Sequence, residues 1–160
     1  MDTLKSELKN VLKGRVTIVG MGNKMRGDDG FGPILSSRIK DKISANVINT
    51  GLTPENHLKE IRKSKPDTIL LIDAADFKGI VGEVRIFKKS DIPSYGLSTH
   101  NMSPALFLSL LETDTKAHIY MLAVQPQKTD VSSTLSIVLM DRCKKIESLF
   151  LELLPKNKIG

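Results

Sequence analysis

Three short motifs in this chain carry acidic or imidazole side chains at positions where they could act together. They are Gly27-Asp28-Asp29-Gly30, Leu71-Ile72-Asp73-Ala74 and Ser98-Thr99-His100-Asn101. We expect each motif to lie where a strand of an open α/β sheet ends, because ligands of such sheets bind outside the carboxyl ends of the strands. Two carboxylates and one imidazole would supply two hard oxygen donors and one nitrogen donor. That set suits a divalent metal with open coordination positions.

Each of these residues also has a purely structural interpretation. One acid of the pair Asp28 and Asp29 is sufficient to cap the following helix, so the second acid needs another reason. Asp73 could accept hydrogen bonds from backbone amides in a turn. His100 taken alone is more typical of a turn residue than of a ligand. The hypothesis of a metal site therefore depends on the predicted convergence of the acids and the histidine.

The elements that must position the motifs follow from the spacing of apolar residues. We predict helices over 2–12, 30–43, 53–64, 102–111 and 132–154, and strands over 15–21, 47–49, 68–72, 82–87 and 117–124. The run 68–72 is apolar throughout, which is typical of a central strand, whereas alternation over 82–87 indicates an edge strand. Thr53 is expected to cap its helix, with Pro54 at the first position.

The order of these elements predicts a fold class and a domain plan. Alternating strands and helices indicate a three-layer α/β/α sandwich with a mostly parallel, twisted sheet of about five strands. A chain of 160 residues is long enough to bury a real core, so we expect one domain over residues 1–160. The helix within residues 1–14 is expected to be an extra N-terminal element.

Composition narrows the classes of protein to consider. The chain has no Trp, two Tyr and five Phe, so a stacking platform for single-stranded nucleic acid is not expected. The net charge of +6 comes from scattered lysines, which favours a solvated surface, with attraction to an acidic protein partner as the alternative. A single cysteine, Cys143, and the lack of a long apolar run favour a cytoplasmic protein without membrane insertion. We expect it to act as a monomer.

The loop after the first strand does not have the sequence of a nucleotide cradle. Gly20 and Gly22 begin a dinucleotide fingerprint, but its third glycine would fall at Met25. The glycine spacing of a P-loop is followed by Asp28 and Asp29, where Lys and then Ser or Thr would be needed. Two carboxylates repel a triphosphate, so this loop favours a cation over a nucleotide.

The remaining candidate nucleophiles and ligands are weaker. His57 and His118 are expected to be structural or exposed. Cys143 falls within the last predicted helix and not on a strand-to-helix turn, so we do not expect it to be a nucleophile. The chain also lacks the Gly-x-Ser-x-Gly elbow of serine hydrolases.

Six segments, in this order, resemble the NiFe-hydrogenase maturation proteases. They are Val19–Asn23, Gly27–Pro33, Thr53–Asn56, Ile72–Asp76, Thr99–Met102 and Val124–Pro126. The resemblance covers roughly residues 15 to 150 and is closest to the branch that processes the large subunit of hydrogenase 3. It implies an endopeptidase that removes a short C-terminal extension from the large-subunit precursor after nickel has been inserted. It also implies that Asp29, Asp73 and His100 touch that nickel.

The resemblance leaves the chemistry of cleavage open. Nickel is expected to be carried by the precursor, with weak or absent binding to the isolated protein. The attacking water could be activated by the metal, or by Asp29 or Asp73 as a general base. Residues expected to orient the ligands are Asp28, Asp76, Asn101 and Gln125.

Two other functions remain as alternatives. A receiver-like phosphoacceptor domain also has an acidic pair after its first strand and an Asp after its third. Here the pair lies a full loop beyond the strand, and Gln125 replaces the Lys expected before Pro126. A metal-sensing or adaptor protein without enzymatic activity is the second alternative, and it predicts metal binding without cleavage.

Overall fold

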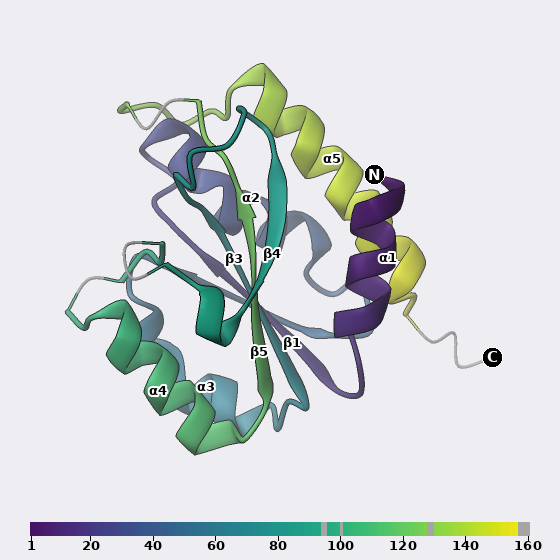
Figure 1. Cartoon of the computed structure of the whole chain (residues 1–160), viewed down its shortest axis with the longest axis vertical. Coiled ribbons are helices and arrows are strands. Elements are labelled where there is room, and N and C mark those ends of the chain that lie inside the picture. Colours follow the sequence, from purple (N-terminus) through teal and green to yellow (C-terminus); the bar gives the residue numbers. More distant parts are fainter. Residues whose placement is uncertain (94–95, 100, 128–129, 157–160) are drawn as a thin grey trace.

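The computed structural model describes residues 1–93, 96–99, 101–127 and 130–156 (Figure 1). Its α-helices are α1 (Asp2–Val11), α2 (Phe31–Ile39), α3 (Leu58–Lys63), α4 (Pro104–Thr115) and α5 (Ile137–Leu153). Its strands are β1 (Val16–Met21), β2 (Asn46–Gly51), β3 (Thr68–Ala74), β4 (Val84–Lys88) and β5 (His118–Val124). Short 3-10 helices are η1 (Gly27–Gly30), η2 (Pro54–His57) and η3 (Lys89–Asp91).

The strands form one sheet in the order β2-β1-β3-β5-β4. β1, β2, β3 and β5 are parallel to their neighbours, and β4 runs antiparallel to β5. β3 is therefore the central strand and β4 an edge strand, as their apolar patterns predict. Because β4 runs the other way, it ends at the edge of the sheet opposite the carboxyl ends of the parallel strands.

Helices cover both faces of the sheet, which confirms the predicted three-layer α/β/α sandwich (Figure 1). Leu70 and Ile72 of β3 pack in a core cluster with side chains of α1, α2 and α5. Ile69 and Leu71 point to the other face and join a cluster with side chains of α3 and α4. Alternate residues of the central strand thus belong to different cores, which is why its sequence is a continuous apolar run.

The N-terminal helix is part of the first core cluster. Leu4 and Leu8 of α1 are buried there, and the side chain of Leu8 is fully inaccessible. Full burial of a leucine side chain stabilises a protein by about 1.5–3 kcal/mol. In the part of the chain that the structure describes, no helix is long and apolar enough to span a membrane.

Two glycines allow α2 to pack closely over the ends of β1 and β3. A Cβ atom on Gly20 would lie 1.8 Å from Ser36 Oγ. One on Gly32 would lie 2.2 Å from the carbonyl oxygen of Met21 and 2.5 Å from that of Ile72. Only glycine fits at such distances. The first turn of α2, and η1 directly before it, are therefore held against the carboxyl edge of the sheet.

Some predicted boundaries are wrong for identifiable reasons. The last helix begins at Ile137 and not at residue 132, because Ser132 pairs its backbone with residues 25–27 in an isolated bridge. The helix predicted over 30–43 ends at Ile39. Thr53 precedes η2 but its side chain makes no capping hydrogen bond.

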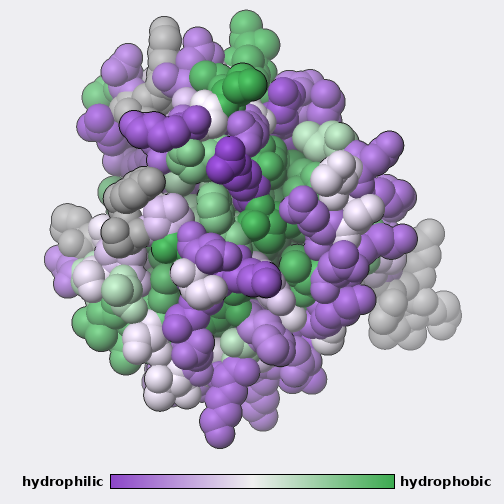
Figure 2. All heavy atoms as spheres, viewed as in Figure 1, coloured by the Kyte–Doolittle hydropathy of each residue, from purple (hydrophilic) through white to green (hydrophobic). Residues whose placement is uncertain are grey.

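Hydrophilic residues cover most of the face shown in Figure 2 and are not gathered in one patch. Hydrophobic side chains show in smaller groups at the top, near the middle and at the lower left of this view. The hydrophilic cover of this face agrees with the interpretation of the net charge as a solvated surface.

Candidate functional site

Asp73 lies at the carboxyl end of the central strand and is fully buried. The backbone N–H of Ser98 donates to its Oδ2 at 2.6 Å, and the hydroxyl of Ser98 donates to its Oδ1 at 3.0 Å. Burial raises the pKa of Asp73 well above its ordinary value; the two bonds from Ser98 lower it, and the nearby charge of Asp29 raises it further. A fully buried carboxyl in this position costs stability unless it has a partner that compensates its charge.

Asp29 lies in η1 and approaches Asp73 from the loop that follows β1. Its Oδ2 accepts a hydrogen bond from the backbone N–H of Asn23 at 3.1 Å. Partial burial raises the pKa of Asp29, while the Asn23 N–H and the charge of Arg26 lower it. Asp29 is only partly buried, so it can be reached from solvent, unlike Asp73.

Gly22 is the residue that allows these two acids to come close. Its φ of +134° lies in a region that other residues rarely adopt. A Cβ atom there would lie 2.1 Å from the carbonyl oxygen of Asp29 and 3.5 Å from Oδ1 of Asp73. The backbone of η1 can therefore cross directly over the end of β1, beside β3.

The pair of acids can bind a cation or handle a proton. Two neighbouring carboxylates repel each other when both are ionised, which is one reason that the pKa of Asp73 is raised. A divalent cation between them would remove the repulsion and release protons. A carboxyl with a raised pKa is also better matched to general-base chemistry near neutral pH.

His100 lies outside the described residues, so its predicted role as a third ligand remains a prediction. The residues on either side are described: Ser98 contacts Asp73, and the backbone N–H of Asn101 donates to Glu55 Oε1 at 2.9 Å. Within the described ranges, no group of three His, Cys, Asp or Glu residues is arranged to hold a metal. The described part of the site is thus a two-carboxylate site.

The prediction that the motif Ser98-Thr99-His100-Asn101 follows the carboxyl end of a parallel strand is wrong. We expected the segment containing residues 98–101 to lie where a strand ends at the carboxyl edge. The strand before it, β4, is antiparallel and ends at the opposite edge. The chain must return past η3 to bring Ser98 to Asp73, so the contact depends on this connection and not on strand direction.

Asp28 is adjacent to Asp29 but has a different set of partners. It is fully buried, and its carboxylate accepts hydrogen bonds from Ser136 N–H at 2.7 Å, Ser136 hydroxyl at 2.9 Å and Gln127 N–H at 2.8 Å. These bonds tie η1 to the start of α5. Neither acid caps α2, whose N-cap is Gly30 without a side-chain hydrogen bond, so the expected capping role is wrong.

Gln125 and Asp76 organise the turn that follows β3. Gln125 Oε1 accepts hydrogen bonds from the N–H groups of Phe77 and Gly79, both at 3.0 Å. Its Nε2 donates to Asp76 Oδ1 at 3.1 Å. These contacts fix the turn against the end of β5. The predicted role of both residues in orienting ligands remains a prediction.

The other titratable candidates lie away from this site. Cys143 is fully buried in α5, and burial raises the pKa of its thiol to about 11, which agrees with the prediction that it is not a nucleophile. His57 Nδ1 lies 3.1 Å from Glu60 Oε1 in a partly exposed pair.

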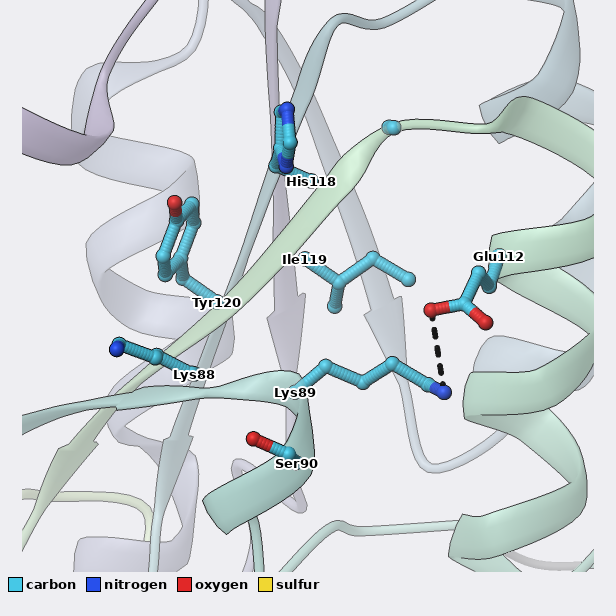
Figure 3. A pocket seen from close by; sticks show the side chains of 8 residues that line it. Lys88, Lys89, Ser90, Glu112, His118, Ile119 and Tyr120 are labelled. Carbon is cyan, nitrogen blue, oxygen red and sulfur yellow. Dashed lines mark ion pairs between the residues drawn. The ribbon is translucent and has the colours of Figure 1, made fainter.

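A hollow of about 340 Å³ lies at the opposite edge of the sheet and includes His118 (Figure 3). Its one drawn ion pair joins Lys89 Nζ and Glu112 Oε2 at 3.2 Å. In Figure 3, His118 and Tyr120 lie on the other side of the β5 ribbon from that pair. The polar groups therefore do not converge, and this hollow is not a second reactive site.

Two residues that contact the site were not candidates in the sequence analysis. Glu55 belongs to a segment that carries the family resemblance and Ser98 directly precedes another, but no periodicity or spacing relates them to the acids. Their contacts join residues 25 and 46 positions apart in the chain. Only the folded backbone brings these groups together.

Comparisons with known proteins agree with this architecture. A family profile described as hydrogenase maturation protease matches residues 32–153. The hydrogenase 3 maturation protease of Escherichia coli K12 is 36% identical over 109 residues, covering 66% of this chain and 69% of that protein. The profile match includes Asp73 and begins just after Asp29.

Solved structures of the same kind superpose on the chain. The [NiFe] hydrogenase maturation protease HycI from Thermococcus kodakarensis KOD1 has a TM-score of 0.83 at 29% identity, covering 92% of this chain and 98% of that one. The hydrogenase maturating endopeptidase HybD from Escherichia coli has a TM-score of 0.68 at 16% identity, covering 87% and 91%. The second likeness is one of fold alone.

Proposed function

This chain belongs to the hydrogenase maturation protease family, and we propose that it removes the C-terminal extension of a NiFe-hydrogenase large-subunit precursor once nickel is in place. The protein is thus an endopeptidase. The proposed site rests on one observation: Asp29 approaches the fully buried Asp73 at the carboxyl edge of the sheet.

Nickel is best understood as part of the substrate. Asp29 and Asp73 supply two oxygen donors, and His100 is proposed as a third ligand. A site with so few ligands and with mutual repulsion between its acids should hold a free cation weakly. A nickel ion that is already bound to the precursor would complete its coordination here. Cleavage would then depend on metallation, because the ion would compensate the mutual repulsion of the two acids.

The two acids differ in how they can take part in hydrolysis. Asp73 is enclosed and bonded on both oxygens by Ser98, which suits a fixed ligand. Asp29 is partly exposed and its pKa is raised, which suits a base that takes a proton from water. In this scheme the water oxygen adds to the scissile carbonyl carbon, Asp29 receives the proton, and the proton then passes to the departing amine.

The partner and location follow from the same proposal. The partner is a folded protein precursor and not a nucleic acid or a membrane. The one cysteine is a buried thiol, which is compatible with the reducing conditions of the cytoplasm. We propose that the enzyme acts there as a monomer.

The decisive experiment is mass spectrometry of the cognate precursor after incubation with this protein, with and without nickel in the precursor. We expect loss of one C-terminal peptide only from the nickel-loaded precursor. Equal cleavage of the precursor without nickel would contradict the proposal that cleavage depends on the metal. An intact precursor with nickel verified in place would favour the adaptor alternative, and transfer of phosphate from acetyl phosphate would favour the receiver alternative.

A further inference from the structure

Two carboxylates from different parts of the sheet edge hold the segment 98–101 at its two ends. At one end, Asp73 accepts the N–H and the hydroxyl of Ser98, at 2.6 and 3.0 Å. At the other end, Glu55 Oε1 accepts the N–H of Asn101 at 2.9 Å. Each end thus has a hydrogen bond from a backbone amide, which fixes the main chain at Ser98 and at Asn101.

The order of the strands shows where this segment lies. Glu55 is in η2, which follows β2, and Asp73 ends β3. β1 lies between β2 and β3 in the sheet. Ser98, held by Asp73, and Asn101, held by Glu55, therefore lie on the two sides of the carboxyl end of β1, where Gly22 begins the loop to Asp29.

The anchor at Asp73 also leaves that carboxylate able to act. An ionised carboxylate has about four acceptor positions on its two oxygens. Ser98 places one donor on each oxygen, which fixes the plane of the carboxylate without filling its acceptor capacity. Ligand groups held in this way need less reorganisation when a metal or substrate arrives.

Glu55 has no part in the proposed chemistry, yet it is partly buried at the same edge. We propose that Glu55 and Ser98 are positioning residues, which hold Asn101 and Asp73 on the two sides of the end of β1 and thereby align Asp73 for the precursor. This inference rests on the proposed function for its consequence in catalysis, but the clamp itself is a property of the isolated protein.

Two pairs of substitutions test the clamp: the pair at Glu55 separates its hydrogen bond from its charge, and the pair at Ser98 tests the hydroxyl. Glu55→Gln keeps an oxygen that can accept from Asn101 N–H, whereas Glu55→Asp keeps the charge but is one methylene too short to reach it. Ser98→Thr keeps the hydroxyl and Ser98→Ala removes it. Glu60→Gln is the matched control, because Glu60 is an exposed acid five positions further along the chain whose carboxylate pairs with His57.

The first readout is hydrogen exchange at the Asn101 amide of the isolated protein, which does not depend on any cleavage. We expect at least tenfold faster exchange in Glu55→Asp, and exchange close to wild type in Glu55→Gln and Glu60→Gln. Equal exchange in Glu55→Asp and wild type would overturn the clamp, even if the protein proves not to be a protease.

The second readout is steady-state cleavage of the nickel-loaded precursor, with thermal unfolding measured for every variant. We expect kcat to fall at least tenfold in Glu55→Asp and Ser98→Ala with KM within about twofold, and near wild-type kcat in Glu55→Gln and Ser98→Thr. Equal losses in Glu55→Gln and Glu55→Asp, or no loss in either Glu55→Asp or Ser98→Ala, would overturn the positioning role. A wild-type protein that fails to cleave would instead refute the proposed function.

Discussion

Asp28 and Asp29 are adjacent in the sequence but belong to two different regions of the molecule. Asp28 accepts hydrogen bonds from three donors on the connection between β5 and α5. Asp29 accepts one, from a residue of its own loop, and faces Asp73. Asp28 is fully buried and Asp29 only partly. The region around Asp28 is thus a structural anchor, and the region around Asp29 is the proposed site.

The difference indicates what separates a structural acid from one that we propose to be reactive. Hydrogen bonds that the fold directs at a carboxylate stabilise its ionised form, whereas burial and a neighbouring acid disfavour it. Asp28 gains its compensation from the folded chain alone. Asp29 and Asp73 retain raised pKa values, so an additional positive charge from outside the chain would stabilise their ionised forms.

The largest expected effect is on cleavage, from Asp29→Asn. We expect the rate of precursor processing to fall by about 10²–10⁴-fold, the usual contribution of a general base. The free energy of unfolding should change little, because this side chain makes a single hydrogen bond in the described structure. Rates are measured by mass spectrometry and stability by urea denaturation. Processing at more than half of the wild-type rate would end the assignment of Asp29 to the chemistry.

The next effect is on stability, from Asp28→Asn. The amide would present its NH2 group to donors on Ser136 and Gln127, leaving buried N–H groups poorly matched. We expect the free energy of unfolding to fall by about 3 kcal/mol, since bonds to a charged group contribute about 1.5–3 kcal/mol each and are not additive. Cleavage per folded molecule should remain within about threefold of wild type. A stable variant that does not cleave the precursor would place Asp28 in the site and contradict its assignment as a structural acid.

A third effect, on the pH dependence of stability, distinguishes Asp73 from both Asp28 and Asp29. Burial raises the pKa of Asp73 in the folded protein, so the folded state binds its proton more tightly than the unfolded state does. The stabilising contribution is full below the unfolded pKa of about 3.9 and is lost as pH rises through the raised folded pKa. Asp73→Asn removes this loss of stability, and it should also slow processing because Asp73 is proposed to contact the nickel.

The measurement is urea denaturation of wild type and Asp73→Asn across a pH series. We expect the advantage of the variant to grow as pH rises above about 4 and to level off once the folded pKa of Asp73 has been passed. An advantage that shrinks with rising pH would mean that the buried carboxylate is already compensated in the isolated protein. Asp73 would then resemble Asp28.

The smallest effect is expected from Cys143→Ala, which tests a buried group outside both regions. Its thiol has a pKa raised to about 11, so it should not react with a thiol reagent at pH 8 until the protein unfolds. Cleavage by the variant should stay within about twofold of wild type, with a loss of about 1 kcal/mol in stability from the small cavity. A large loss of cleavage would contradict the assignment of reactivity to the acids.

Much of the scaffold could be predicted because it depends on local patterns. The apolar run at 68–72 predicted a central strand, and alternation at 82–87 predicted an edge strand, and both are confirmed. The start of α5 could not be predicted in the same way. The sequence near Ser132 is compatible with a helix, but its backbone pairs with residues 25–27, about a hundred positions earlier.

The same distinction applies to the site. The approach of Asp29 to Asp73 follows from the rule that parallel strands end at one edge, so the sequence was sufficient. The path of the segment 98–101 was not predictable from that rule, because β4 is antiparallel. The hydrogen bonds from Ser98 to Asp73 and from Asn101 to Glu55 are long-range contacts that no local pattern encodes.

The bond between Asp28 and Ser136 has a consequence for the synthesis of the protein. It joins residues 108 positions apart, and a chain is made from its N-terminus at about 5–20 residues per second. The loop that carries Asp28 and Asp29 therefore lacks this one anchor until the start of α5 has been made, several seconds after the acids themselves. During that interval the nascent chain lacks the bond between Asp28 and Ser136, so the tie between η1 and α5, beside the proposed site, is completed only when synthesis is almost finished.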